Sequence, residues 1–485
     1  MGIIAFFLRL CSSLINIYKQ ILYPYTKMHE LGIFIFHRDF RIVDNIGLYE
    51  SAKLCKKIVP VFIFTPQQIS AENKFRSNNA IQFMIESLDD LDQATGSKLL
   101  CFYGDTTEVL SKLIGELKPG FVGFNRDYTP FATARDTEVA EMCEKKGVEC
   151  KTFADYYLFE PSTLTKNGIQ EFVKQTDEDL KKDVYRKFTP FYNKALMNKS
   201  HMAKSVGSVS NFFKPDVKMN TVDLTEKYLS LELNPDIVNN GGRENGKKIL
   251  LQIPEHYEKT RNVLSVSTSL LSPYIKFGCI SVREAYEKFP QPIRRQLFWR
   301  DFYAHILYAF PKLGHPVDPK YEKIEWDNNR TWFNAWTNGK TGFPVVDACM
   351  RQLNATGYMH NRGRLIVASF LTKTLLIDWR LGEKYFAQKL VDYDVASNMH
   401  NWLWIAGGGA DSQEYFRIFS PWEQSKGSDP DCVYIKQWVP ELADVENRKI
   451  HNWFKDFDKS VYVEPIVDYQ EQKKKVLTAY KKIFA

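Results

Sequence analysis

The strongest constraint on the fold is a pattern of alternating apolar and polar segments early in the chain. The apolar runs are LGIFIFHRDFRI (31–42), IVPVFIFTP (58–66), KLLCFYGD (98–105), GFVGFNRDY (120–128) and VECKTFADY (148–156). Polar or amphipathic segments separate them at about 76–95, 106–117 and 132–146. Such alternation is typical of an open parallel sheet flanked by helices, so we predict a Rossmann-like α/β domain over residues 29–156. A nicotinamide-type G-x-G-x-x-G fingerprint is absent from its first unit.

The pattern changes further along the chain. Residues 157–246 are polar, with clusters such as NKSHMAKSVGSVS, and we expect a long linker draped over the surface. After residue 247 the strand pattern nearly vanishes. Helical periodicity replaces it in QLFWRDFYAHILYAF, FPVVDACMRQL and RLIVASFLTKTLLIDW. We therefore predict a large all-helical C-terminal domain over residues 247–485.

The first 27 residues differ from the rest because they are apolar, contain no acidic residue and carry Arg9, Lys19 and Lys27. A targeting segment or an interfacial helix fits this composition. We favour a plain N-terminal extension over residues 1–28, because Met28 directly precedes the first strand-like run. No later segment has some 18 uninterrupted apolar residues, so we expect no membrane span in the folded part.

Composition narrows the function classes only a little. Aromatic residues make up 14% of the chain, which indicates a large aromatic core or surfaces that stack on flat ligands. The net charge of +7 is compatible with a polyanionic partner. None of the eight cysteines forms a C-x-x-C pair or lies near histidines at metal-ligand spacing, so we expect neither a metal site nor a disulfide framework.

Four motifs in the C-terminal region carry candidate chemistry. In TSLLSPYIKFGC (268–279), the hydroxyls of Thr268, Ser269 and Ser272 precede Pro273. They suit a helix cap, and the backbone N–H groups of such a helix start also suit a phosphate. In RRQLFWRDFYAH (294–305), four residues three or four apart share one helix face: Gln296, Trp299, Arg300 and Tyr303. That face fits core packing or a flat, anionic, hydrogen-bonding ligand.

The other two motifs lie further on. In GYMHNRGRLIVASF (357–370), Asn361, Arg362 and Arg364 open an apolar helix, where positive charge opposes the macrodipole and calls for solvation or an anionic partner. In ASNMHNWLWIAGGG (396–409), Trp402 and Trp404 point about 200° apart on a helix. Three polar residues precede them: Asp392, Asp394 and Asn398. The carboxylates could hold a polar ligand or cap the helix.

Together these blocks resemble the cryptochrome/photolyase family, most closely its class I enzymes for cyclobutane pyrimidine dimers. The resemblance spans about Leu31 to Leu442 and includes FHRDFRIVDNIGL, TSLLSPY, FWRDFY, KTGFPVVDACMRQL, MHNR, LLIDWRLGEKYF, NWLW and YFRIF. It implies an FAD cofactor, bent within the helical domain. The residues matching the flavin-binding set are Tyr257, Thr268, Ser269, Leu270, Leu271, Ser272, Arg300, Asn361, Arg364, Asp392, Tyr393, Asp394 and Asn398, with Asn398 facing flavin N5.

The resemblance also implies two roles for tryptophan. Trp402, Trp379 and Trp326 match the family's electron-transfer chain, and with Asn398 they form the expected catalytic set. Trp299 and Trp404 match the aromatic residues that clamp a flipped-out dimer. The full expected lesion- and DNA-binding set is Arg261, Gln296, Trp299, Tyr303, Asn361, Arg362, Trp404 and Gln424.

The implied function is light-driven repair of UV-damaged DNA, in which excited reduced FAD donates an electron that splits cyclobutane pyrimidine dimers. We expect a monomer in a DNA-containing intracellular compartment. The alternatives for an antenna chromophore are a folate, a deazaflavin, another flavin or none. Two alternatives remain. Repair of (6-4) photoproducts is disfavoured because Asn361 and Leu365 occupy the family's two histidine positions, although Gln296 is typical of that group. A blue-light receptor is disfavoured by the short C-terminal tail.

Overall fold

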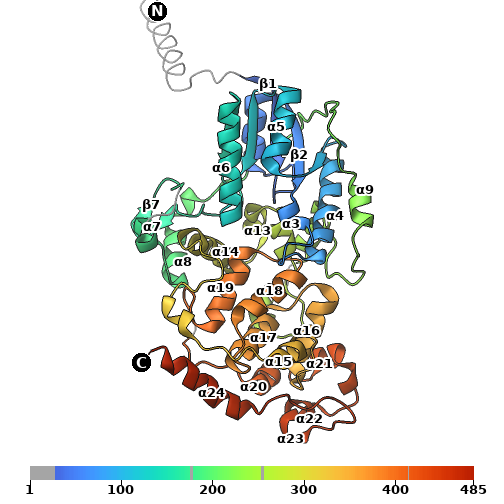
Figure 1. Cartoon of the computed structure of the whole chain (residues 1–485), viewed down its shortest axis with the longest axis vertical. Coiled ribbons are helices and arrows are strands. Elements are labelled where there is room, and N and C mark those ends of the chain that lie inside the picture. Colours follow the sequence, from blue (N-terminus) through green and yellow to red (C-terminus); the bar gives the residue numbers. More distant parts are fainter. Residues whose placement is uncertain (1–27, 175–177, 253–255, 413, 485) are drawn as a thin grey trace, which may run out of the picture.

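The computed structural model describes residues 28–174, 178–252, 256–412 and 414–484; the predicted extension, apart from Met28, lies outside them. The molecule has an α/β layer at one end and a larger helical body at the other (Figure 1). The C-terminal helix α24 crosses the outer edge of the helical body (Figure 1). The predicted fold class is therefore confirmed. No helix in the described ranges is both long and apolar enough to span a membrane.

The α/β layer is built on a five-stranded parallel sheet in the order β3-β2-β1-β4-β5. Its strands are β1 (His29–Phe36), β2 (Cys55–Phe64), β3 (Leu100–Tyr103), β4 (Phe121–Asn125) and β5 (Glu149–Phe153). The helices between them are α2 (Ile46–Leu54), α3 (Pro66–Ile69), α4 (Asn78–Ala94), α5 (Thr106–Leu117) and α6 (Pro130–Lys145). All five predicted strands are present. The apolar and polar pattern did not predict α2, which has only nine residues.

Side-chain caps explain where these helices begin. Ser77, Asp105 and Thr129 each accept a hydrogen bond from a backbone N–H in the first turn of the helix that follows. These residue types satisfy N–H groups that have no partner within the helix. The helix starts are therefore fixed locally, after each strand or loop.

The segment over residues 157–246 is more than a surface connection. It contains β6 (Leu164–Thr165), β7 (Gly168–Ile169), α7 (Glu178–Asp183), α8 (Phe188–Met197), η1 (Lys199–His201), α9 (Leu224–Leu229) and α10 (Arg243–Leu250). Three aromatic residues of α8 are buried in the main core: Phe188, Phe191 and Tyr192. The sequence of this segment is polar overall, and each of its helices buries only a few side chains. These helices could therefore not be predicted from the apolar pattern.

The remaining described residues form no strand. The helices are α11 (Tyr257–Thr260), α12 (Ser272–Lys276), α13 (Val282–Lys288), α14 (Gln291–Ala309), η2 (Pro319–Lys323), α15 (Arg330–Thr337), α16 (Pro344–Thr356), α17 (Asn361–Lys373), α18 (Trp379–Lys389), α19 (Val395–Ala406), α20 (Pro421–Ser428), α21 (Val433–Trp438), η3 (Pro440–Leu442), α22 (Asn447–His451), α23 (Trp453–Asp456) and α24 (Tyr469–Lys482). Helices α14, α17, α18 and α19 pack on one another in the centre of this body.

A buried ionic cluster joins the two parts of the molecule. Arg283 of α13 pairs with Asp155 at 2.7 Å and with Asp44 at 3.0 Å. Arg41 also pairs with Asp155, at 2.5 Å, and donates to the carbonyl of Gly278 at 3.0 Å. Because opposite charges are compensated inside the interface, the loops after β1 and β5 are held against the helical body. This contact places the end of β1 next to the site described below.

Candidate functional site

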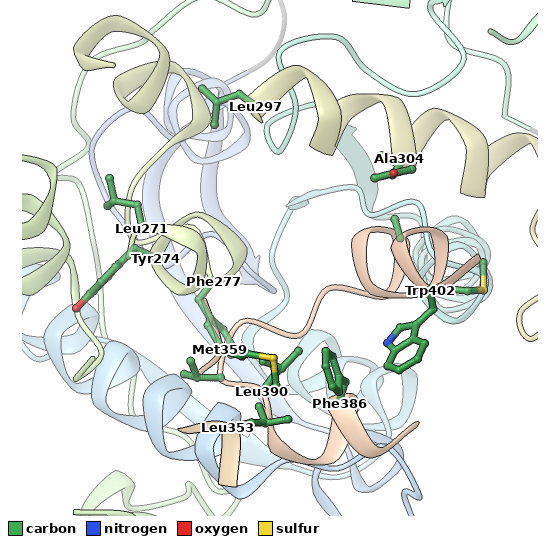
Figure 2. Close-up of a cluster of buried hydrophobic side chains, with 14 of the residues drawn as sticks. Leu271, Tyr274, Phe277, Leu297, Ala304, Leu353, Met359, Phe386, Leu390 and Trp402 are labelled. Carbon is green, nitrogen blue, oxygen red and sulfur yellow. The ribbon is translucent and has the colours of Figure 1, made fainter. Parts of the chain in front are cut away.

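A cavity of about 470 Å³ lies in the helical body, between α12, α14, α17, α18 and α19. Its apolar lining includes five residues that also belong to the main core and are labelled in Figure 2: Leu271, Leu297, Phe386, Leu390 and Trp402. Trp402 and Phe386 lie side by side, with ring centroids 5.0 Å apart (Figure 2). Part of the cavity wall therefore belongs to the packed core of the helical body.

The structure brings most of the predicted site residues to this one cavity. Those that line it are Tyr257, Arg261, Thr268, Ser269, Leu271, Ser272, Gln296, Trp299, Arg300, Tyr303, Asn361, Arg364, Asp392, Tyr393, Asp394, Asn398, Trp402 and Trp404. The expected single helix face of Gln296, Trp299, Arg300 and Tyr303 is confirmed, since all four face the cavity from α14.

Three predicted binding residues do not line the cavity. The carbonyl of Leu270 accepts a hydrogen bond from Asn239 at 2.8 Å, so its backbone is engaged elsewhere. Arg362 donates to Asn262 at 2.6 Å on the outside of α17. Gln424 lies on α20 and is half-buried. If these three residues bind FAD or DNA, they do so outside the cavity lining.

Two predicted tryptophans of the electron-transfer chain, Trp379 and Trp326, also lie outside the cavity lining. Trp379 begins α18 and is buried. A Cβ atom at Gly382 would lie 2.3 Å from the ring of Trp402, so α18 packs directly on Trp402. Trp326 is half-buried and contacts Tyr480 edge-on, with ring centroids 6.2 Å apart. The backbone N–H of Asp327 donates to Leu376 at 2.8 Å, which ties the Trp326 loop to the segment before α18.

The first polar wall is organised around Asp392. Its carboxylate accepts from Arg364 at 2.8 Å and from Ser272 Oγ at 2.6 Å. Thr268 Oγ1 lies 3.2 Å from Tyr358 Oη. Helix α12 begins at Ser272 and has no side-chain cap, so the interpretation of these hydroxyls as helix caps is wrong. Ser272 instead connects the start of α12 to the loop before α19, and Thr268 contacts the loop before α17.

The second polar wall is organised around Asp394, which both caps α19 and forms an ion pair. Its Oδ1 accepts from the backbone N–H of Ser397 at 2.9 Å, and its Oδ2 from Arg38 at 2.8 Å. Burial would raise the pKa of Asp394, but the guanidinium groups of Arg38 and Arg300 hold it well below its usual range. Arg38 follows β1 and also pairs with Asp127 at 3.0 Å. No local pattern predicted Arg38, because it lies 356 positions before Asp394.

The cavity retains an excess of positive charge. Both carboxylates of its lining are neutralised by Arg364 and Arg38, as described above. Arg300 contacts the ring of Tyr157 at 4.4 Å and donates to a backbone carbonyl. Lys276 also lines the cavity, although no sequence pattern predicted it. Burial and the nearby Arg38 lower the pKa of Lys276 to about 8. Since neither Arg300 nor Lys276 has a carboxylate within ion-pair distance in the described ranges, the cavity suits an anionic ligand.

Asn398 is held in one orientation. Its Nδ2 donates to the carboxylate of Glu383 at 3.1 Å and to the backbone carbonyl of Glu383 at 3.2 Å. Tyr393 donates to the same carboxylate at 3.3 Å. Burial raises the pKa of Glu383, and these hydrogen bonds oppose the rise. Because both partners of Nδ2 are acceptors, the Oδ1 of Asn398 is left for a donor in the cavity. No local sequence pattern predicted Glu383, which lies 15 positions before Asn398.

The mouth of the cavity is aromatic. Trp299 on α14 and Trp404 on α19 are half-buried and line the cavity from different elements. Trp402 is buried and contacts Trp336 edge-on, with ring centroids 6.3 Å apart. Trp402 and Trp404 were predicted to point in different directions from the helix. In the structure the indole of Trp402 is buried and that of Trp404 is partly exposed. The described residues contain no group of three metal-ligating side chains.

Comparison with known families decides the classification. The model of the FAD binding domain of DNA photolyase matches residues 293–482, and the DNA photolyase model matches residues 33–206. A deoxyribodipyrimidine photo-lyase of Buchnera aphidicola is 32% identical over 477 residues, covering 92% of this chain and 96% of the relative. The chain belongs to the DNA photolyase family.

Solved photolyase structures agree with this assignment. An archaeal photolyase from Sulfolobus tokodaii, solved with two FAD molecules, has a TM-score of 0.83 and 38% identity, covering 93% of this chain and all of the other. A class III photolyase from Agrobacterium tumefaciens has the same TM-score and 32% identity, covering 94% and 98% of the two chains. The photolyase helical domain of this chain therefore contains the cavity, and FAD is its cofactor.

Proposed function

We propose that this photolyase repairs UV-damaged DNA by splitting cyclobutane pyrimidine dimers in light. The observation that carries the proposal is the pairing of a positively charged polar cavity with two tryptophans at its mouth. The cavity suits an anionic dinucleotide, and the mouth suits a flat base lesion turned out of the duplex. Related photo-lyases that match 92% of this chain and 96% of their own length carry the corresponding name.

The residues of the cavity fit FAD. Arg300 and Lys276 supply the positive charge that a diphosphate needs, while Ser269 and Asn361 add polar groups to the lining. Leu297, Phe386 and Trp402 provide an apolar surface for a flat ring system. The Oδ1 of Asn398 would accept a hydrogen bond from the protonated N5 of a reduced flavin, because Glu383 engages the amide nitrogen.

Each residue then has a defined task. Reduced FAD, when bound and excited, supplies the electron that splits the dimer. Trp299 and Trp404 would stack on the extruded bases, and Gln296 would hydrogen-bond a base edge. Trp402, Trp379 and Trp326 would carry electrons inward from the surface, and Arg261, Arg362 and Gln424 would contact the DNA backbone or lesion. Enclosure by α14 and α19 would keep water from the reacting bonds.

The lining favours cyclobutane dimers over (6-4) photoproducts. None of the described lining residues is a histidine, and Asn361 and Leu365 are present instead. The nearby imidazoles of His360 and His400 are buried, and burial lowers their pKa values to about 4 and about 3. The described lining therefore offers no imidazole to a repair route that requires histidine acid–base chemistry, which supports the choice of cyclobutane dimers.

The direct test is illumination of the purified protein with DNA that contains one defined lesion. We expect blue light to restore the pyrimidines of cyclobutane-dimer DNA and to leave (6-4) DNA unchanged, with dark samples as controls. Repair of (6-4) DNA alone would overturn the choice of lesion. Flavin binding and light response without repair of either lesion would instead indicate a photoreceptor.

We further propose that the α/β domain, taken as residues 29–156, holds an antenna and that the protein acts as a monomer. Among the predicted alternatives, a second flavin gains support over folate and deazaflavin because the Sulfolobus tokodaii relative was solved with two FAD molecules. Extraction of the bound chromophores and their absorption spectra would distinguish the three. Sedimentation of the protein would test the oligomeric state.

Glu383 offers a test of the Asn398 orientation. Glu383→Leu removes one of the two acceptors that hold Nδ2, so we expect FAD to bind about 2- to 12-fold more weakly, as for the loss of one hydrogen bond. Glu383→Gln retains a side-chain acceptor and should bind FAD almost as the native protein does. Flavin fluorescence during dilution measures the dissociation constant. Equal weakening in both variants would show that the carboxylate charge, and not the orientation of Asn398, matters.

A further inference from the structure

The chain segment at the start of α8 contacts Trp299 of the cavity mouth and also the loop that follows Trp404. Phe188 stacks face to face on Trp299, with ring centroids 3.7 Å apart and planes inclined by 6°. Phe188 itself is only 1% exposed and is fixed by Tyr192 and Phe302. One face of the Trp299 indole is therefore covered by a rigid ring, and a ligand in the mouth can use only the other face.

The same segment also contacts Asp411, which lies outside the cavity lining in the loop after α19. The backbone carbonyl of Arg186 accepts from the N–H of Asp411 at 2.9 Å, and Lys187 Nζ lies 3.5 Å from its carboxylate. Asp411 has φ of 54°, a left-handed conformation that is uncommon for residues other than glycine. Such a conformation persists where neighbouring contacts determine it, and here the contacts come from residues 186 and 187.

Asp411 is linked to Trp404 by a short, tied loop. The N–H groups of Gly407 and Gly409 both donate to the carbonyl of Leu403, at 2.9 and 3.2 Å. The hydroxyl of Ser412 donates to the carbonyl of Gly409 at 2.7 Å. The end of α19, which carries Trp404, and the loop at Asp411 therefore form one hydrogen-bonded unit.

We propose that residues 186–188, here called the strap, set the spacing and orientation of Trp299 and Trp404 for the lesion. The inference rests on the proposed function and assigns Phe188 as a positioning residue that does not itself touch DNA. With Phe188 in place, Trp299 is held ready before the lesion arrives, so binding does not need to order its side chain. The linker thereby determines lesion affinity, although it contributes no residue to the cavity.

A matched pair of variants separates positioning from ordinary core packing. Phe188→Leu removes the ring behind Trp299. Phe191→Leu removes a ring from the same helix that packs on Phe302 and His305 and has no contact with Trp299 among the ring contacts described. Phe188→Tyr keeps an aromatic ring and serves as the conservative rescue. All three retain the cavity lining.

The measurements are the dissociation constants for dimer-containing and undamaged DNA, together with the rate of flavin photoreduction. For Phe188→Leu we expect roughly two- to tenfold weaker binding of dimer DNA, with binding of undamaged DNA and photoreduction unchanged. Phe191→Leu should lower the melting temperature but leave lesion binding unchanged, and Phe188→Tyr should bind as the native protein does.

Distinct outcomes overturn distinct claims. If Phe188→Leu binds dimer DNA as tightly as the native protein, or if Phe191→Leu weakens lesion binding equally, the strap has no positioning role. If the native protein itself does not prefer dimer-containing DNA, the proposed function fails first. Flavin content and circular dichroism of each variant confirm that a weaker affinity does not come from loss of the fold.

Discussion

Replacement of Trp402 with phenylalanine is expected to slow photoreduction of oxidised FAD by more than an order of magnitude. Trp402 is the buried indole of the cavity lining, and it is packed against α18, which begins at Trp379. A phenylalanine ring keeps most of the packing but is much harder to oxidise than an indole. Electrons from the protein surface would therefore lose their last carrier before the flavin.

The same variant should repair dimers at the native rate when its flavin is already reduced, because repair does not use this inward path. Absorbance during illumination with a thiol measures photoreduction, and chemical reduction with dithionite prepares the enzyme for the repair assay. Trp422→Phe is a matched control, since Trp422 is buried against Phe343 and does not line the cavity. Unchanged photoreduction in Trp402→Phe would remove Trp402 from the electron path.

Trp404→Ala is the second change with a large expected effect. Stacking of one base on an aromatic side chain contributes roughly 1–3 kcal/mol, so dimer-containing DNA should bind roughly 5- to 150-fold more weakly. Undamaged DNA should bind almost as before, because it keeps its bases in the duplex and does not reach the mouth. FAD content should also remain unchanged, since the polar walls around Asp392 and Asp394 are intact.

Two control variants sharpen this experiment. Trp404→Phe retains a stacking surface and should lose much less affinity than Trp404→Ala. Trp332→Ala removes a half-buried indole from α15, away from the cavity lining, and should not alter lesion binding. Fluorescence anisotropy of labelled duplexes gives the affinities. If Trp404→Ala binds dimer DNA as tightly as the native protein does, the lesion does not stack on Trp404.

Local sequence patterns predicted the parts of the fold that follow from periodicity. The alternation of apolar and polar runs predicted the parallel sheet, and the spacing of Gln296, Trp299, Arg300 and Tyr303 predicted a shared helix face. Both depend only on the repeat of a strand or a helix. The short helices of the linker could not be predicted in this way, because each buries too few residues to show a clear helical period.

Apolar and polar periodicity predicted the two-part architecture, and helical spacing predicted the shared face of α14. Most other residues of the cavity lining were predicted from motifs that resemble those of the cryptochrome/photolyase family. The way those residues are held became visible once the elements were packed together: Arg38 neutralises Asp394, Glu383 orients Asn398, and Phe188 covers Trp299. Such contacts join residues that are far apart in the chain or lie on different elements. Their geometry is set by how the elements pack and by compensation of buried charge, which no local pattern records.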